Sequence, residues 1–360
     1  MSAPAPSPLK LVPGITAALA ITGVAVWLAE RIGHDLLHAT GPSPVSPITV
    51  AIVLGIIIGN IMGPRQALAP GLEFCVQKLL RLGIVLIGLK LSIGDVAQLG
   101  LYGVPVVMLV IAGGLGFTLA MSRWAGLPFG LGLLTAAATS ICGVTAAVSV
   151  APVIEATDEE LSYAVANVTL FGVVGMLFYP YLAHAVFGDR SMGAGLFLGT
   201  SIHDTSQVMG AALSYKQLFH DEVAFKVATV TKLTRNVFLV AVVPLLAWLH
   251  ARRQGTARRG TNAVGLFPQF VLYFLLMVLV RTAVDVKFQT SATWISIWKA
   301  LADTGATILL ATALASVGLT TQLSRLRGLG LRPLFVGAFA ALVVGGLGMG
   351  LALLVSRIAP

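Results

Sequence analysis

Charged residues are scarce in this 360-residue chain and make up only 10% of it. Soluble domains carry about 25% charged residues, so the shortage excludes an ordinary water-soluble globular protein. Hydrophobic residues account for 57% of the chain, and the mean hydropathy is +0.93. This is more apolar sequence than a single buried core could absorb, which indicates a membrane protein.

Cysteine is nearly absent as well. The two cysteines, Cys75 and Cys142, both lie in apolar stretches, and they form neither a disulfide framework nor a metal-ligand spacing. The chain also lacks a Walker loop and the nucleophile elbow of hydrolases. We therefore expect no metal, no cofactor and no enzymatic activity.

Long apolar runs recur from the N-terminal region to the C-terminus. A helix that crosses a bilayer needs about 20 predominantly apolar residues. The runs predict an all-α polytopic membrane protein with about eleven transmembrane helices. These lie near residues 11–30, 48–64, 72–94, 101–123, 130–150, 160–186, 193–213, 222–250, 264–283, 293–319 and 332–356.

The net charge of +9 does not indicate nucleic acid, because Lys and Arg lie mainly in short connections. Basic loops of membrane proteins stay on the cytoplasmic side. If the Arg252–Arg259 loop is cytoplasmic, the same side holds Arg65, Arg123, Arg190 and the Arg325–Arg332 cluster. The acidic stretch 155–160 then lies outside, and the N-terminus lies in the cytoplasm.

Two internal similarities indicate duplication, which is common in transporters. The stretch from Gly83 to Ser92 resembles that from Thr312 to Thr321, and Thr139-Ser-Ile-Cys-Gly143 resembles Thr200-Ser-Ile-His-Asp204. The first pair relates helices of opposite orientation, as in an inverted repeat. The second pair relates parallel segments, unless one Thr-Ser-Ile segment is a re-entrant hairpin.

These similarities predict three parts of the chain. Residues 1–46 form an extra N-terminal helix and loop, residues 47–190 form a first transmembrane repeat, and residues 191–360 form a second.

Polar residues gather where two apolar segments should cross the membrane. In the stretch Gly199–Gln207, seven of nine residues have hydrogen-bonding side chains. A lipid-facing helix could not satisfy so many polar groups. We predict an inverted-repeat core with two broken helices, crossing or re-entrant, that form a site near the membrane midplane. Its substrate-binding candidates are Thr139, Ser140, Cys142, Gly143, Thr145, Thr200, Ser201, His203, Thr205 and Ser206.

Two cations lie about ten residues into the span that follows Asp221. Lys232 and Arg235 are one helical turn apart, so they share one face, and Asn236 lies beside them. Helix ends exposed at a break also favour an anion. We therefore assign all three residues to the binding of an anionic substrate. The alternative is a structural ion pair with Asp204 or another acid.

Three residues, one of them already a substrate-binding candidate, are candidates for coupling to an ion. His203 beside Asp204 has the pattern of a proton relay, and Asp303 is an acid inside a predicted span. An interior histidine with no transport role is the alternative for His203, and small-residue packing is the alternative for the Thr-Ser-Ile segments. Lys90 is predicted to snorkel from the end of its span.

At these residues the sequence resembles the YeiH-type UPF0324 group of bacterial membrane proteins. The resemblance rests on the two Thr-Ser-Ile motifs, on Lys232-Leu-Thr-Arg-Asn236 and on Ile87-Gly-Leu-Lys-Leu91, and it covers most of the chain from about Pro47 onward. More distantly, the chain is similar to the bile acid/arsenite/riboflavin transporter superfamily. That similarity implies an elevator-type carrier of two inverted repeats, often a homodimer, in which core and panel domains move past each other.

The family is named for sulfate export. The resemblance thus implies a secondary transporter of the bacterial cell inner (plasma) membrane that exports a small anion such as sulfate or sulfite. In this hypothesis His203 and Asp204 would handle a coupling proton. The expected partners of the transporter are that substrate and membrane lipid. The alternatives are a cation-coupled carrier of an organic acid, an ion channel, and a membrane-embedded enzyme or assembly factor. An enzyme should show a nucleophile–base pair or a metal constellation, and His203 with Asp204 alone is too little. A channel should show rings of like charge or a repeated filter, and neither is visible.

The predicted orientation can be tested with single cysteines. A cysteine placed in the Arg252–Arg259 loop should be shielded from a membrane-impermeant thiol reagent in intact cells, whereas one near Asp158 should react, because basic loops stay inside. The parent protein, with only its own two cysteines, sets the background. The reverse labelling pattern would contradict the orientation.

Overall fold

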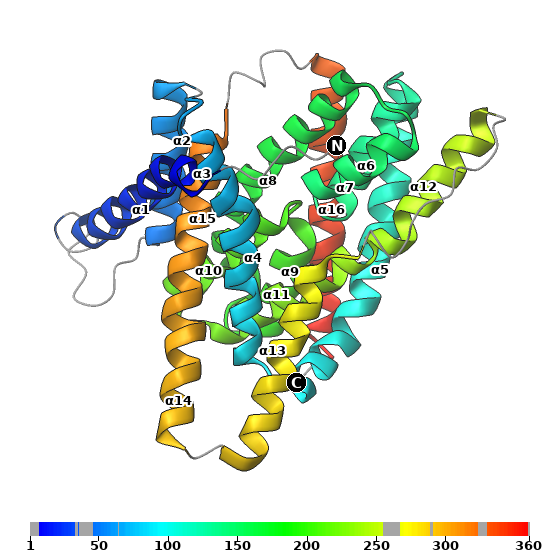
Figure 1. The fold of residues 1–360 in the computed structure, drawn as a ribbon. Helices are drawn as coiled ribbons and strands as arrows, with labels where there is room; N and C mark the ends of the chain where they lie inside the picture. The colour runs from blue at the N-terminus through cyan, green and yellow to red at the C-terminus, as the bar shows by residue number, and fades with distance from the viewer. Residues whose placement is uncertain are drawn as a thin grey trace. The chain divides into compact units, whose positions relative to one another are not determined.

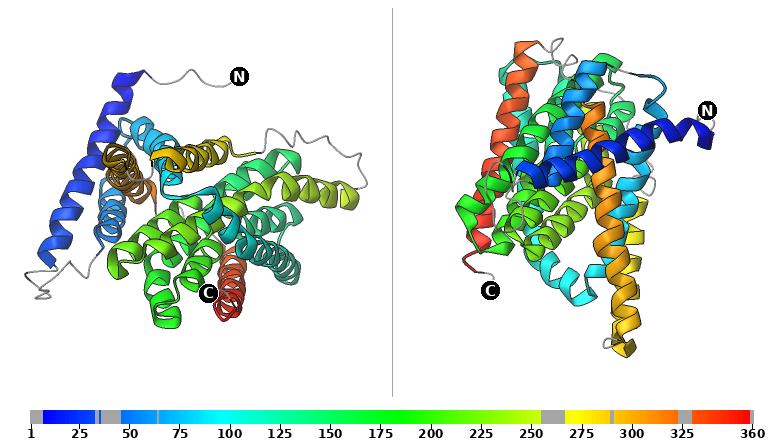
Figure 2. Two further views of the ribbon diagram at one scale, coloured as in Figure 1. Left: turned by 90° about the horizontal axis from the view of Figure 1, so that it is seen from below. Right: turned by 90° about the vertical axis from the view of Figure 1, so that its left-hand side faces the viewer.

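The computed structural model describes residues 7–32, 35, 46–63, 65–254, 267–288, 291–322 and 330–358, and over these residues it contains helices and no strand. Arg258, Arg259, Arg325 and Arg327, which carry part of the predicted orientation, lie outside the described residues. The helices are α1 (Pro8–Arg31), α2 (Pro47–Met62), α3 (Ala69–Phe74), α4 (Leu80–Ile87), α5 (Ile93–Trp124), α6 (Phe129–Ser140), α7 (Val144–Val150), α8 (Asp158–Phe187), α9 (Ser191–Ser201), α10 (Thr205–Phe219), α11 (Glu222–Val237), α12 (Leu239–Gln254), α13 (Gln269–Phe288), α14 (Ala292–Lys299), α15 (Ala306–Thr320) and α16 (Leu331–Val355) (Figures 1 and 2).

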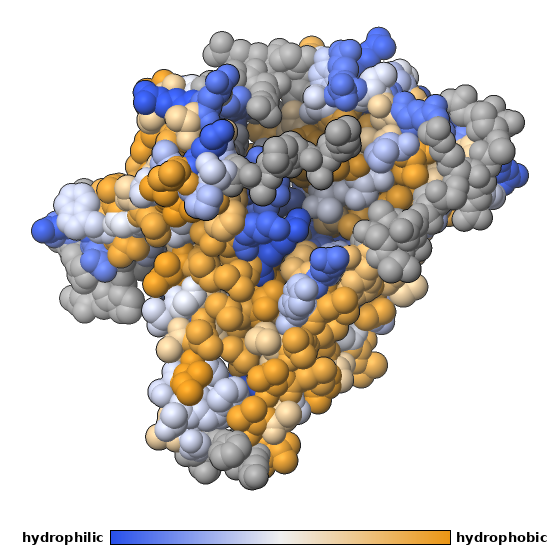
Figure 3. Space-filling view, in the orientation of Figure 1, coloured by the Kyte–Doolittle hydropathy of each residue, from blue (hydrophilic) through white to orange (hydrophobic). Residues whose placement is uncertain are grey.

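Helices lie near every predicted span. Among the described residues, seven helical stretches are long and apolar enough to cross a membrane. Large apolar side chains such as Leu101, Met108 and Phe117 are exposed along α5, and Figure 3 shows many hydrophobic side chains at the surface. Such a surface suits lipid and not water. The all-α polytopic class is thus confirmed, whereas about eleven crossings remain a prediction.

The chain forms two compact units, each built from separate stretches of sequence. Unit 1 contains α1 to α4 and α13 to α15, and unit 2 contains most of α5, then α6 to α9, most of α10, α11, α12 and α16. The predicted repeats 47–190 and 191–360 are continuous stretches instead, and they remain a prediction.

In unit 1, glycines bring α2 and α15 into backbone contact. A Cβ added to Gly55 would lie 2.8 Å from the carbonyl oxygen of Ala315, and one added to Gly318 would lie 2.5 Å from that of Ile52. Lipid tails are as apolar as leucine, so helices in a membrane associate through close packing at small residues. This pair of helices therefore depends on its glycines.

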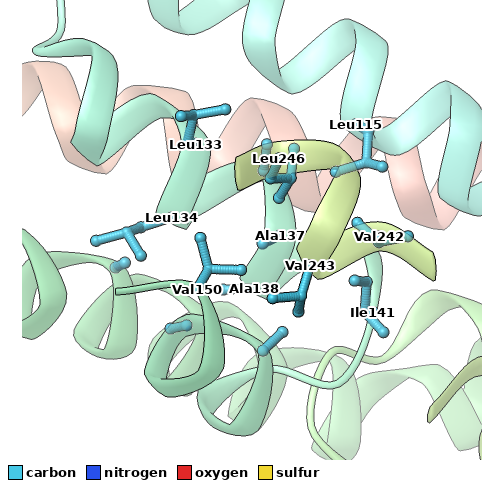
Figure 4. Close-up of a cluster of buried hydrophobic side chains, with 14 of the residues drawn as sticks. Leu115, Leu133, Leu134, Ala137, Ala138, Ile141, Val150, Val242, Val243 and Leu246 are labelled. Atoms are coloured by element: carbon cyan, nitrogen blue, oxygen red, sulfur yellow. The ribbon is translucent and has the colours of Figure 1, made fainter. Parts of the chain in front are cut away.

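In unit 2, buried apolar side chains join α5, α6, α7 and α12 (Figure 4). Leu115 comes from α5, Leu133 from α6, Val150 from α7 and Leu246 from α12. Beside this cluster, α9 packs against α11 and α16, and α6 packs against α8. The two predicted broken segments, α6–α7 and α9–α10, are therefore held by long neighbouring helices within one unit.

Glycine sets how closely α11 approaches α9. A Cβ added to Gly199 would lie 2.7 Å from the Cβ of Thr231. Since Lys232 follows Thr231, this close approach places the two cations of α11 beside the end of α9.

The close packing in unit 1 leads to a stability prediction. Gly318→Ala should lower the free energy of unfolding by about 1–3 kcal/mol, because the added methyl group must push α2 away from α15. The measurement is thermal unfolding in detergent. Gly23→Ala in α1 is the matched control, since nothing lies within 4 Å of its added Cβ. Equal melting of the two variants would show that the α2–α15 contact does not limit stability.

Candidate functional site

The first helix break lies between α6 and α7, at residues 141–143. Gly143 has φ +65° and ψ −125°, a conformation that residues with a Cβ rarely adopt. A Cβ on Gly143 would also lie 3.0 Å from the backbone of Asp204. Glycine is therefore required here both for its conformation and for close approach to the second break.

The second break lies between α9 and α10, at residues 202–204. Ile202 is extended, with φ −93° and ψ 138°. Asp204 then starts α10 as its cap: its Oδ2 accepts hydrogen bonds from the backbone N–H (2.9 Å) and the hydroxyl (2.6 Å) of Ser206. A carboxylate at a helix start offsets the partial positive charge of that end. Helix breaks at both Thr-Ser-Ile motifs are thus confirmed.

After the first break the chain turns back, because Glu160 at the start of α8 accepts a hydrogen bond from the backbone N–H of Leu131 at the start of α6 (3.2 Å). The prediction that the acidic stretch 155–160 lies on the opposite side from Arg123 was therefore wrong, since α6 and α7 form a re-entrant pair and not a crossing helix.

The two breaks lie against each other. Nδ1 of His203 is 3.1 Å from the carbonyl oxygen of Thr139. A carbonyl can only accept, so this hydrogen bond requires the proton on Nδ1. The histidine side chain is buried, and it therefore links the second break to the last turn of α6.

Lys232 reaches from α11 to both breaks. Its Nζ donates to the carbonyl oxygens of Ile141 (3.0 Å), Ile202 (3.2 Å) and His203. Three acceptors require three N–H bonds, which an ammonium group has and a neutral amine does not. The geometry therefore calls for a charged lysine, although its side chain is fully buried.

Arg235 reaches the ends of α6 and α9. Nε donates to Ser140 O (2.8 Å), Nη1 to Thr200 O (2.7 Å) and Ile202 O (3.0 Å), and Nη2 to Thr139 O (2.6 Å). Its side chain is fully buried as well. One N–H of Nη2 has no acceptor among the described residues.

The two cations thus satisfy carbonyl groups that a broken helix leaves open. The last carbonyls of a helix lack partners within it and carry partial negative charge. The sequence suggested either the solute or Asp204 as the partner of Lys232 and Arg235. Among the described residues, their hydrogen bonds run to backbone carbonyls, and neither cation forms an ion pair with a carboxylate.

The hydroxyl groups of the two motifs are buried beside the same cations. Thr139 and Thr200 donate to carbonyls one turn earlier in their own helices. Ser201 donates weakly to Gly345 O at 3.5 Å, whereas the Ser140 hydroxyl is buried with no partner in the described structure. A Cβ on Gly114 would lie 2.6 Å from this hydroxyl, so Ser140 also packs closely against α5.

The remaining predicted residues of unit 2 fall into two groups. Asn236 donates through Nδ2 to Thr205 Oγ1 (3.1 Å) at the start of α10, and Cys142 and Ser206 are buried near the breaks. The side chain of Thr145 is exposed, so it does not join the buried cluster.

Asp303 belongs to unit 1, in the π-helical turn Ala300–Gly305. It forms an ion pair with Lys90, whose side chain is only 4% exposed. Lys90 lies at the end of the 3₁₀ turn Gly88–Lys90. The prediction that Lys90 snorkels was wrong. Its side chain is buried against the carboxylate of Asp303 and does not extend along the span towards water.

Two buried amides of unit 2 were not singled out in the sequence. Gln207 accepts from the N–H of Asp204 (3.1 Å) and donates to Thr169 O (3.2 Å). Asn167, in the first half of α8, donates to Pro333 O (3.0 Å). Asn167 is a polar residue inside an apolar span, and this pattern could have identified it from the sequence.

Arg235 should be essential for stability. Arg235→Gln removes charged donors from the ends of α6 and α9, and hydrogen bonds to charged groups contribute about 1.5–3 kcal/mol each. We therefore expect a large fall in melting temperature in detergent. The melting temperature of Arg235→Lys should lie between those of the wild type and Arg235→Gln, because lysine keeps the charge but lacks the guanidinium fork.

Lys226→Gln on the same helix is the control. Lys226 is half-buried and forms no hydrogen bond or ion pair among the described residues, and substitutions that break no such contact change stability by about 0.5 kcal/mol or less. If Arg235→Gln melts like Lys226→Gln, the carbonyl contacts of Arg235 do not hold the breaks together.

Comparison with known proteins places the chain in a family. A family model described as "Conserved hypothetical protein 698" matches residues 13–337. A UPF0324 membrane protein of Pseudomonas aeruginosa is 34% identical over 352 residues, which cover 94% of this chain and 93% of the relative. Those of Pasteurella multocida and Corynebacterium glutamicum are 30% and 32% identical over 84% and 91% of this chain, and over 87% and 88% of their own lengths. The chain belongs to the UPF0324 family of bacterial membrane proteins.

Proposed function

We propose that this protein is a secondary transporter that exports a small sulfur-containing anion, such as sulfate or sulfite, across the bacterial inner membrane. One observation carries the proposal. Two buried cations, Lys232 and Arg235, lie where two helix breaks touch, and among the described residues no carboxylate pairs with either of them.

The charges around the breaks favour an anion. The ends of α6 and α9 offer partial negative charge, and the start of α10 offers partial positive charge, which Asp204 offsets. The carbonyls around Lys232 and Arg235 are dipoles that solvate the two cations without neutralising them, and the nearby carboxylate of Asp204 supplies one negative charge against two positive ones. A region of low dielectric that stays positive attracts an anion strongly.

The residues of the breaks supply the proposed binding groups. An oxyanion could accept hydrogen bonds from the Nη2 N–H of Arg235 and from the hydroxyl of Ser140, which both lack a partner among the described residues. Thr200, Ser201 and the pair Thr205–Asn236 complete the proposed site. In this scheme His203 and Asp204 handle a coupling proton, while Asp303, paired with Lys90 in unit 1, is a second candidate.

The wider architecture follows the same proposal. We propose an inverted-repeat core and an elevator-type movement, in which unit 2, the unit that holds both broken helices, carries the solute. We also propose that the transporter is a homodimer. Transporters that bind solute at broken helices near the midplane use rigid movements of this kind.

Counterflow in proteoliposomes tests the function. Vesicles loaded with unlabelled sulfite or sulfate should accumulate the labelled anion from outside transiently, because a carrier exchanges one bound anion for another. Lys226→Gln should behave like wild type. Protein-free vesicles and vesicles loaded with succinate are the controls.

The outcomes separate the alternatives. Exchange of succinate but not of sulfate or sulfite would assign an organic-acid carrier. Anion conductance without counterflow would assign a channel. Failure to exchange any of these anions, by protein that melts like a folded sample, would contradict the proposal.

A further inference from the structure

A pocket of about 680 Å³ opens in unit 2, where the ends of α5 and α12 meet the start of α6. Ligand pockets in proteins span about 300–1,000 Å³. The site lies at the edge of the buried cluster of Figure 4: Leu119, Phe129 and Leu249 line the pocket and also pack against that cluster. It is separate from the helix breaks, and its residues have no role in the transport proposal.

Three exposed arginines line this pocket, namely Arg123 at the end of α5 and Arg252 and Arg253 at the end of α12. None of them forms a hydrogen bond or ion pair within the part of the chain that the structure describes. The guanidinium of Arg253 lies over the ring of Phe129, 4.2 Å from its centroid. Stacking leaves the N–H edges of the guanidinium open, and such edges match phosphate oxygens.

The rest of the lining is mostly apolar. Leucines 119, 127, 133 and 249, with Pro128 and Phe129, form most of the wall. A single buried hydroxyl, that of Ser122, lines the pocket and has no hydrogen-bond partner in the described residues. A ligand that satisfies this site needs a compact anionic group joined to a long apolar body.

Two exposed tryptophans adjoin the arginines of the pocket. Trp124 adjoins Arg123 and is 77% exposed. Trp248 is 40% exposed and lies under Arg252, with its ring centroid 5.3 Å from the guanidinium carbon. Exposed tryptophans are enriched at the level of lipid headgroups. We therefore expect the three arginines to lie at the depth of the lipid phosphates.

An acid close by limits where the anion can bind. Glu160 accepts a hydrogen bond from the backbone N–H of Leu131 (3.2 Å), so the start of α6 already has a carboxylate. The anionic group of a ligand is thereby directed to the arginines of α5 and α12. The apolar wall also argues against a vestibule for a small inorganic anion, which would gain nothing from leucine.

We propose that this pocket binds an anionic phospholipid, with its phosphate held by Arg123, Arg252 and Arg253 and an acyl chain on the leucine wall. Basic pockets between transmembrane helices are suited to anionic headgroups. The bound lipid joins the ends of α5 and α12, which belong to the unit that holds both helix breaks.

Lipid binding to the purified, delipidated protein tests this inference. The probes are palmitoyl-oleoyl phosphatidylglycerol, palmitoyl-oleoyl phosphatidylcholine and sn-glycerol 3-phosphate, read by native mass spectrometry and by melting temperature. We expect phosphatidylglycerol alone to bind and to raise the melting temperature. Each arginine near a headgroup contributes about 1 kcal/mol, so Arg253→Gln should weaken binding about fivefold, and the triple Arg→Gln variant should abolish it.

Arg357→Gln is the matched control, because it removes an exposed arginine that does not line the pocket; it should bind as wild type does. Equal binding of phosphatidylcholine would show that the arginines do not select the lipid. Equal stabilisation by glycerol 3-phosphate would assign a soluble anion instead of a lipid. Unchanged phosphatidylglycerol binding in the triple variant would overturn the site itself.

Discussion

A helix that ends inside a membrane leaves carbonyl groups that no water can satisfy, and this constraint governs the centre of unit 2. Lys232 and Arg235 meet it by donating to the last carbonyls of α6 and α9. Other features follow from it: α11 must lie close to α9, which Gly199 permits, and the two breaks must touch, which Gly143 permits.

The same contacts link stability to the proposed transport. Cations solvated by carbonyl dipoles keep their charge, whereas an ion pair would cancel it. The groups that hold the breaks together therefore also create the positive potential that favours an anion. Within the described residues one N–H of Arg235 has no acceptor, so the oxyanion that we propose as the substrate could join the network without dismantling it.

Basic residues act differently in the three places where the structure puts them. Lys232 and Arg235 are buried and donate hydrogen bonds to carbonyls. Lys90 is buried and pairs with the carboxylate of Asp303, whereas Arg253 is exposed and stacks over an aromatic ring. Buried charges need partners within the protein, whereas an exposed arginine at headgroup depth is free to take a lipid phosphate.

The amino-acid sequence by itself determined the class, the helix positions and the two breaks. Apolar runs of membrane length, and polar letters concentrated at Thr139–Gly143 and Thr200–Asp204, are local signals. Only the tertiary structure decided the partners of Lys232 and Arg235. Those partners are backbone carbonyls, which every residue has, so the amino-acid sequence does not distinguish one from another. It likewise decided that Lys90 is buried against Asp303, since residues more than two hundred positions apart in the chain meet only once the helices of unit 1 have packed.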